Sequence, residues 1–269
     1  MPRRTPPNDY SVASKYYDLF YSFWEDSGFY VGLAKMTGGP VLDAMCGTGR
    51  ITIPIARVGA DVVGVDLQQK MLDELARKLQ HEPKRVRSKV KLVRGDIKKN
   101  NLGGPFELAV FAWSSLSEIP TISEQEEVLK NIAAHLKPGG HLAFHSDNPE
   151  DVRPTKEIFK GVQIDEHGNE ISMYQRTMRR KGNGGNSYEL RYRYEIVPRR
   201  GKPKELKTIV VLTYPTKREL MRMLRRAGFD VLKVYGDYDF RRATRGCKQF
   251  IVIARKCDRD QGRGGGRHG

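Results

Sequence analysis

The sequence has only three cysteines, and they are not grouped. Cys46, Cys247 and Cys257 show no CxxC spacing and no nearby pair of histidines, which argues against a disulfide scaffold or a zinc cluster. We therefore expect no metal site. No apolar run approaches the roughly 20 residues that a membrane-spanning helix needs. The basic N-terminus lacks the apolar segment of a secretory signal, so we expect a soluble, cytoplasmic protein that does not contact a membrane.

Positive charge is concentrated in the second half of the chain. The 269 residues include 48 basic and 32 acidic side chains, a formal net charge of +16. Residues 1–150 hold 19 basic and 18 acidic side chains, whereas residues 151–269 hold 29 and 14. A basic half favours an anionic partner such as a phosphate, a carboxylate or a nucleic acid. The same excess is typical of protected strand edges, so the charge alone leaves both interpretations open.

The first half alternates predicted strands with predicted helices. Short apolar runs predict strands at residues 40–45, 61–66, 90–97, 106–113 and 141–146. Helical periodicity predicts helices at residues 51–60, 68–81 and 123–136, the last closed by a KPGG turn. Strands separated by helices pair in parallel through right-handed crossovers. The expected fold class is therefore α/β, with a doubly wound, Rossmann-like sheet.

After residue 150 the pattern changes to β-rich runs without intervening helices. These runs cover residues 161–180, 187–197 and 205–214. They predict an antiparallel β insertion after the fifth strand, and a helix at 217–229 with strands at 230–237 and 248–256 then completes a seven-stranded sheet. The expected division is residues 1–150 (N-terminal helices and core), 151–215 (insertion), 216–256 (completion of the core sheet) and 257–269 (a disordered Gly/Arg-rich tail).

The stretch VLDAMCGTGR places a glycine turn between a strand and a helix. Gly47 and Gly49 permit a tight turn and close approach of the backbone to a ligand. Asp66 ends the next predicted strand, where its carboxylate can accept both hydroxyls of a ribose. Thr52 stands where a dinucleotide fingerprint needs glycine or alanine, and the P-loop sequence GxxxxGK[ST] is absent. The turn and the carboxylate together predict a nucleoside site that does not favour pyrophosphate.

Two further carboxylates indicate which nucleoside this site binds. Asp43 precedes the turn and suits a cationic amine, whereas Asp96 follows the third strand and suits an adenine amino group. S-adenosyl-L-methionine has the ribose, adenine, ammonium and sulfonium that satisfy this set, and its product after methyl transfer is S-adenosyl-L-homocysteine. In the competing interpretation, Asp43 caps the following helix and the glycines serve only the turn.

Across about residues 10–256 the sequence resembles the class I S-adenosylmethionine-dependent methyltransferases. The matching stretches are VLDAMCGTG, GVDLQQKML, GDI, LKPGGHLAF and AGFDVLKVYGDYD followed by QFIVIARK. The opening YSVASKYYDLFY and the β insertion are similar to small-molecule N-methyltransferases such as glycine N-methyltransferase and the sugar-amine methyltransferases. The family usually has glycine where this chain has Met45.

The resemblance implies roles for individual residues. By resemblance, the methionine part of the cofactor is held by Asp43, Gly47 and Gly49, the ribose by Asp66, the adenine faces by Leu67 and Met71, and the adenine edge by Asp96 and Ile97. Tyr17 in the N-terminal helix would close over the cofactor, and packing among neighbouring aromatics is the competing explanation. The remaining predicted cofactor contacts are Ala44, Met45, Cys46, Ala112 and Trp113.

An ammonium acceptor must lose a proton before it can attack the methyl group. A carboxylate or an imidazole at the carboxyl ends of the strands would assist that step. Glu118 follows the fourth predicted strand, His145 ends the fifth with Asp147 just beyond it, and Tyr214 ends the insertion. We select His145, Glu118 and Tyr214 as candidate catalytic residues, with His145 first. A solvated Glu118 and a core His145 are the plain structural alternatives.

The sequence therefore predicts a methyltransferase that acts on a small-molecule acceptor, an amine by resemblance. Arginines of the insertion would suit an anionic group on that acceptor, although exposed hairpin faces look the same: Arg176, Arg179, Arg191 and Arg193. One alternative is a methyltransferase that acts on RNA or protein through the basic half. RNA is not favoured, because the chain has AWSS in place of the signature used for flipped bases. Another alternative is a non-enzymatic cofactor-binding protein, and the oligomeric state stays open.

Overall fold

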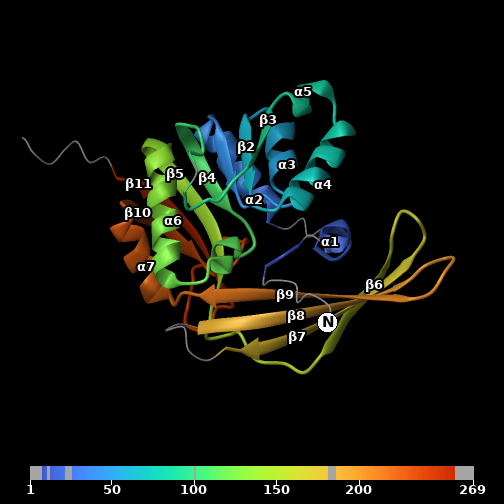
Figure 1. Ribbon diagram of the computed structural model, residues 1–269. Helices are drawn as coiled ribbons and strands as arrows, with labels where there is room; N and C mark the ends of the chain where they lie inside the picture. The colour runs from blue at the N-terminus through green and yellow to red at the C-terminus, as the bar shows by residue number, and fades with distance from the viewer. Residues whose placement is uncertain (1–7, 11–12, 22–25, 100, 181–185, 258–269) are drawn as a thin grey trace, which may run out of the picture.

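The structure, a computed structural model, describes residues 8–10, 13–21, 26–99, 101–180 and 186–257. Its main sheet has seven strands in the order β10-β11-β5-β4-β1-β2-β3 (Figure 1). They are β1 (Val41–Ala44), β2 (Val62–Asp66), β3 (Val90–Arg94), β4 (Phe106–Phe111), β5 (Leu136–Asp147), β10 (Phe229–Tyr235) and β11 (Gln249–Lys256). Strands β1 to β5 pair in parallel, and β11 runs antiparallel to β5 and β10. The predicted Rossmann-like α/β fold is confirmed.

Helices cover both faces of this sheet. The described helices are α1 (Ser14–Tyr21), α2 (Ser27–Thr37), α3 (Thr52–Arg57), α4 (Gln69–Gln80), α5 (Lys84–Arg87), α6 (Ile122–His135) and α7 (Lys217–Arg226), with one 3-10 turn, η1 (Ser115–Glu118). Of these, α1 packs against strands of the insertion and not against the main sheet. Apolar side chains of α2 and α3 pack on one face, and those of α6 and α7 pack on the other. In β4, Leu108 and Val110 face the first layer and Ala109 and Phe111 face the second, as the alternation of a strand requires.

Strand β5 is longer than the sequence predicts. The KPGG segment, expected as a turn between helix and strand, lies within β5 as an irregularity in the pairing with β4. Gly139 has a φ of +71°, and a Cβ on Gly140 would lie 2.9 Å from the carbonyl oxygen of Lys137. These two glycines let the strand continue through a bulge. The prediction of a strand limited to residues 141–146 is therefore wrong.

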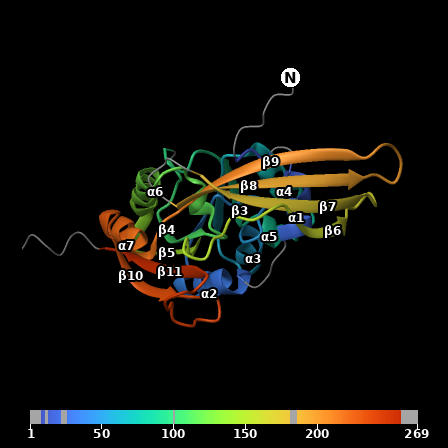
Figure 2. The ribbon, with the colours of Figure 1, turned by 90° about the horizontal axis from the view of Figure 1, so that it is seen from below.

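The second sheet has four antiparallel strands in the order β6-β7-β8-β9 (Figure 2). They are β6 (Ile158–Ile164), β7 (Glu170–Arg179), β8 (Asn186–Val197) and β9 (Lys204–Tyr214). The predicted antiparallel insertion is confirmed, but its first run is two strands. Asp165 accepts the N–H groups of His167 and Asn169 and so closes a turn that the sequence analysis missed. Residues 181–185, between the predicted runs 161–180 and 187–197, and residues 258–269 of the predicted disordered tail lie outside the described residues.

The two faces of β8 differ as its alternating sequence predicts. Tyr194 is buried on the face toward the rest of the protein. Arg191 and Arg193 lie on the other face, where Arg191 pairs with Glu189 (2.6 Å) and Arg193 pairs with Glu157 (2.7 Å). Carboxylates on the outside of the sheet therefore neutralise these two arginines.

The insertion lies across the carboxyl edge of the main sheet, with α1 beside it (Figures 1 and 2). Tyr16 of α1 packs against the inner face of β7 and β8. Gln125 of α6 donates to the carbonyl oxygen of Thr213 in β9 (2.8 Å), and the Thr213 hydroxyl donates to the carbonyl oxygen of Pro120 (2.7 Å). These contacts cover the edge at which open α/β sheets bind ligands. Among the described helices, none is long and apolar enough to span a membrane.

Candidate functional site

Asp66, the last residue of β2, binds the glycine turn that follows β1. Gly47 donates its N–H to Asp66 Oδ2 (2.8 Å), and Gln68 donates its N–H to Asp66 Oδ1 (2.8 Å). Burial raises the pKa of Asp66, and these backbone hydrogen bonds oppose the rise. The Asp66 carboxylate thus faces the glycine turn, as the spacing of the two features predicts.

Met45 stands at the position where the family that this sequence resembles usually has glycine. Its φ is +59°, close to the +55° of Gly47. Met45 therefore adopts the left-handed backbone conformation that glycine adopts most easily, at a cost of about 1–2 kcal/mol. The turn keeps this conformation without a glycine at position 45.

Asp43 lies buried beneath the turn, where Thr52 Oγ1 donates a hydrogen bond to its Oδ2 (2.6 Å). Burial raises the pKa of Asp43 to about 7, although the Thr52 hydroxyl and the positive charge of Arg50 act to lower it. A cationic ligand group beside Asp43 would favour the ionised carboxylate. Thr52, which the sequence analysis uses only to exclude a dinucleotide site, thus orients Asp43.

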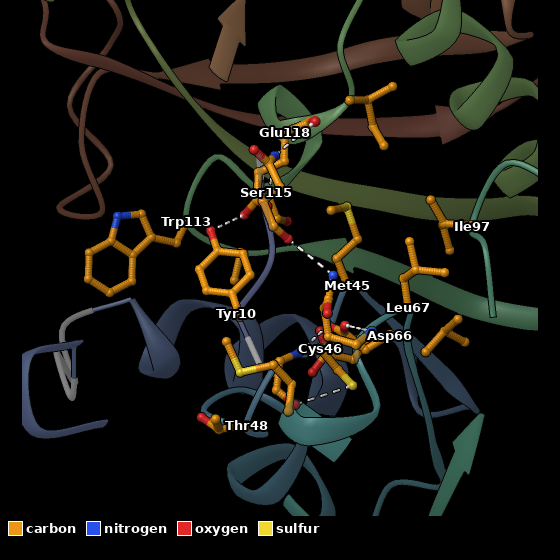
Figure 3. Close-up of a pocket in the computed structure, with 18 of the residues that line it drawn as sticks. Tyr10, Met45, Cys46, Thr48, Asp66, Leu67, Ile97, Trp113, Ser115 and Glu118 are labelled. Carbon is orange, nitrogen blue, oxygen red and sulfur yellow. Dashed lines mark hydrogen bonds between the residues drawn. The ribbon is translucent and has the colours of Figure 1, made fainter. Parts of the chain in front are cut away.

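A cavity of about 270 Å³ opens beside the turn (Figure 3). The predicted cofactor residues that line it are Tyr17, Asp43, Met45, Cys46, Gly47, Asp66, Leu67, Met71, Asp96, Ile97, Ala112 and Trp113. Figure 3 shows Leu67 and Ile97 on one side of it and Trp113 on the opposite side. Carboxylates that accept from hydroxyl and amino groups, together with apolar surfaces, suit a nucleoside with a cationic tail.

Two predicted cofactor residues do not line this cavity. Ala44 is fully buried in β1 and belongs to the core of the sheet. Gly49 has a φ of +83°, and a Cβ there would lie 2.1 Å from Leu75 Cδ1 of α4. A glycine at position 49 therefore allows α4 to pack against the turn. Ala44 and Gly49 thus have packing roles in the structure, and their predicted contact with the ligand stays a prediction, because a sequence motif does not separate packing from binding.

Arg50 lines the same cavity and was not predicted. Its guanidinium pairs with Asp26 and lies over the Trp113 ring, 5.2 Å from the ring centroid. The side chain is mostly buried, so this cation is held in place beside Asp43 and the turn. Arg50 directly follows the GTG turn in the sequence, but no pattern there marks it as a ligand contact.

Glu118, from η1, meets the N-terminal segment at the other end of the cavity. Tyr10 donates its hydroxyl to Glu118 Oε1 (3.1 Å), and Asn8 Nδ2 donates to Glu118 Oε2 (3.3 Å). Burial raises the pKa of Glu118 to about 7, with the Asp66 charge adding to the rise and these two hydrogen bonds opposing it. Asn8 and Tyr10 were not predicted, because only the folding back of the N-terminal segment brings them here.

A second cavity of about 510 Å³ lies beneath the inner face of the insertion. Tyr10, Tyr17, Trp113 and Glu118 line both this cavity and the first one. Further aromatic lining residues are Phe20, Tyr21, Tyr192, Tyr194 and Tyr214. The two cavities therefore meet at shared side chains. A ligand in the first cavity would then lie next to a ligand in the second.

Asp147 is the second carboxylate of this cavity. Burial acts to raise the pKa of Asp147, but the nearby His145 and the hydroxyls of Ser114 and Tyr214 hold it below its usual value. The Ser114 hydroxyl donates to Asp147 Oδ2 at 2.9 Å. Asp147 is therefore ionised at neutral pH, whereas Glu118 titrates near 7. Carboxylates with opposite shifts in one cavity are typical of sites that carry out acid–base chemistry.

The structure places the three predicted catalytic residues differently. Glu118 and Tyr214 line the second cavity. His145 is 6% exposed and lines a separate cavity of about 160 Å³ with Asp26. His145 does not line the second cavity, so the structure brings Asp147 rather than His145 to its wall. His145 Nε2 lies 3.4 Å from Asp147 Oδ1, so His145 contacts the carboxylate that lines the second cavity.

Comparison with known proteins finds a family match within residues 41–140. The family described as "Methyltransferase domain" matches residues 41–140. The cypemycin N-terminal methyltransferase of Streptomyces sp is 31% identical over 118 residues, which cover 44% of this chain and 46% of that protein. The dTDP-4-amino-2,3,4,6-tetradeoxy-D-glucose N,N-dimethyltransferase of Saccharopolyspora spinosa is 29% identical over 100 residues, 37% of each chain. The chain spans less than half the length of the first curated relatives that it matches.

Solved structures extend the likeness to nearly the whole fold. An S-adenosylmethionine-dependent methyltransferase from Clostridium acetobutylicum superposes with a TM-score of 0.74 at 17% identity, covering 91% of this chain and 98% of that one. A sugar N-methyltransferase from Streptoalloteichus sp gives 0.73 at 18% identity, with coverage of 94% and 95%. These similarities establish the fold, and the methyltransferase family predicted from the sequence is confirmed for residues 41–140.

The contact between Gly49 and Leu75 leads to a prediction about stability. We expect Gly49→Ala to lower the free energy of unfolding by about 3 kcal/mol, because it adds both left-handed strain and a clash with α4. Gly59→Ala is the matched control, since its φ is +92° but its added Cβ would meet no atom within 4 Å. It should lose only about 1 kcal/mol. Urea unfolding measures both values, and equal losses would contradict the packing role of Gly49.

Proposed function

We propose that this chain, which carries a methyltransferase domain at residues 41–140, transfers a methyl group from S-adenosylmethionine to the amine of a small-molecule acceptor. The proposal depends on one observation: the cavity beside the glycine turn and the cavity beneath the insertion meet at Tyr10, Tyr17, Trp113 and Glu118. A methyl donor and an acceptor would face each other at this point. Relatives whose names specify N-methylation support an amine as the acceptor.

The residues of the first cavity fit S-adenosylmethionine. Asp66 would accept the ribose hydroxyls, and Asp96 would accept the adenine amino group. Asp43 would bind the ammonium of the methionine tail, and Arg50 would bind its carboxylate. When bound, this cofactor supplies a methyl group that its positive sulfur has already activated. Tyr17, which lines both cavities, would cover that end of the ligand.

The side chains of the second cavity would align the acceptor and take its proton. Asp147, ionised at neutral pH, would hold the acceptor ammonium by charge. Glu118 would accept the ammonium proton, which frees the nitrogen lone pair for attack on the methyl carbon. Correct alignment of the two reactants would contribute most, up to roughly 7–11 kcal/mol of the barrier. The aromatic lining would keep water away from the reacting atoms.

A polymer acceptor has less support. The second cavity lies beneath the four-stranded sheet, and the arginines that face outward from β8, Arg191 and Arg193, are paired with glutamates. The alternative of a non-enzymatic cofactor-binding protein rests on Met45, which stands where the family usually has glycine. Because Met45 keeps the left-handed conformation, that substitution is not evidence of a lost site.

The pKa of Glu118 leads to a prediction about pH. With S-adenosylmethionine saturating at every pH, we expect kcat/KM for the acceptor to rise with pH through about 7, because protonated Glu118 cannot accept a proton. Glu118→Gln should remove this limb and lower kcat about 10²–10⁴-fold. Glu127→Gln, a change at an exposed glutamate of α6, is the control and should keep the wild-type profile. An unaltered limb in Glu118→Gln would rule out Glu118 as the base.

The hydrogen bond between Thr52 and Asp43 leads to a prediction about cofactor binding. We expect the affinity for S-adenosylmethionine to fall as the pH drops through about 7, because protonated Asp43 no longer attracts the ammonium. Thr52→Val removes a hydrogen bond that lowers the pKa of Asp43, so it should move this fall to higher pH. Thr52→Ser keeps a hydroxyl and should behave as wild type. Calorimetric titrations across pH test this, and superimposable Val and wild-type curves would speak against it.

Transfer of label from methyl-labelled S-adenosylmethionine tests the proposed function. The protein is incubated with the label and with separate metabolite, RNA and protein fractions of a cell extract. We expect the label to appear in the metabolite fraction, on nitrogen. Label confined to RNA or protein would favour a polymer acceptor. Binding of the cofactor without any transfer would favour the non-enzymatic alternative.

A further inference from the structure

A further cavity of about 400 Å³ adjoins the acceptor cavity and shares Val152 and Arg153 with it. Arg179, the last residue of β7, lines it as well. It therefore offers room for a part of the acceptor that extends beyond Val152. Two guanidinium groups border this room.

Two hydrogen bonds hold the segment before β6 against the end of β7. Thr155 donates its N–H to the carbonyl oxygen of Thr177 (2.9 Å), and Thr177 donates its N–H to Thr155 Oγ1 (3.0 Å). Arg153 and Arg179 each lie two residues from these hydrogen bonds, and both line the cavity. Like charges that line one cavity repel each other. An anion between the two guanidinium groups would remove this repulsion.

The described part of the protein does not neutralise these charges. Arg153 Nη1 donates only to the carbonyl oxygen of Val152 (3.2 Å), and within the described residues no ion pair joins Arg153 or Arg179 to a carboxylate. Glu150 is the one carboxylate among the described residues that line this cavity. On the outer face of the same sheet, by contrast, Arg193 pairs with two glutamates and a third lies 3.7 Å away.

We propose that this pocket binds an anionic group of the acceptor, a phosphate or a carboxylate, between Arg153 and Arg179. Guanidinium groups bind both anions through paired, charge-assisted hydrogen bonds. The amine of the same acceptor would lie at Glu118 and Asp147, an assignment that rests on the proposed function. The acceptor is then a molecule with a cationic amine at one end and an anionic group at the other.

Calorimetric titration with two probes tests the pocket independently of methyl transfer. Inorganic pyrophosphate represents the phosphate group, and succinate represents the carboxylate group. We expect the wild-type protein to bind at least one probe, and the stronger binder identifies the anion. Arg153→Gln with Arg179→Gln should bind that probe at least about tenfold more weakly. Arg85→Gln with Arg87→Gln, a matched change at two exposed arginines of α5, should bind it as wild type does.

A second double variant distinguishes a loss of anion binding from a loss of folding. Arg153→Lys with Arg179→Lys keeps both charges but loses the planar fork, so its affinity should lie between those of wild type and the glutamine variant. Two results of the titrations would overturn the proposal. One is a wild-type protein that binds neither probe, and the other is a folded glutamine variant that binds as tightly as wild type.

The charge of the labelled product separates this inference from the proposed function. We expect the methyl-labelled metabolite to be retained on an anion-exchange column above about pH 11, where its methylated amine is neutral and its anionic group remains charged. A labelled product that passes through the column would overturn the anion pocket while leaving methyl transfer intact. If no fraction accepts label, the proposed function fails, and the probe titrations alone decide whether the pocket binds anions.

Discussion

The hydrogen bond from the Gly47 N–H to the Asp66 carboxylate is the contact on which the candidate site depends. Strands β1 and β2 pair in parallel and in register, so both end at the same edge of the sheet. The turn after β1 and the carboxylate that ends β2 are therefore brought together by strand pairing itself. Because the second Asp66 oxygen accepts the N–H of Gln68, the start of α4 is fixed by the same side chain. One buried carboxylate thus sets the shape of the first cavity.

Asn8 connects this arrangement to the insertion. Its N–H donates to the carbonyl oxygen of Ile209 (2.8 Å), and its Oδ1 accepts the N–H of Val211 (2.7 Å), so it extends the edge of β9. Its carbonyl oxygen accepts a hydrogen bond from the Gln68 side chain (3.1 Å), and its amide contacts Glu118. A single residue therefore links the covering sheet, the nucleoside loop and the proposed base. Displacement of the N-terminal segment would open both cavities at once.

Local patterns were sufficient to predict the seven-stranded sheet with its antiparallel insertion, the glycine turn, the position of Asp66 and the two faces of β8. They failed where function depends on contacts between distant segments, as for Asn8, which reaches Glu118 from 110 positions away. Strand position alone also did not decide which side chain at the end of β5 faces a cavity, so His145 was chosen where Asp147 lines the wall. The turn motif predicted Gly49 as a ligand contact. In the structure, the glycine at this position allows α4 to pack against the turn.

A crystal structure of the protein with bound S-adenosylhomocysteine tests the central claim most directly. The account predicts ribose hydroxyls within hydrogen-bonding distance of Asp66, adenine beside Asp96, and the sulfur directed toward the meeting point of the two cavities at Tyr17 and Glu118. A nucleoside bound elsewhere, or one whose sulfur is separated from the cavity beneath the insertion, would contradict it.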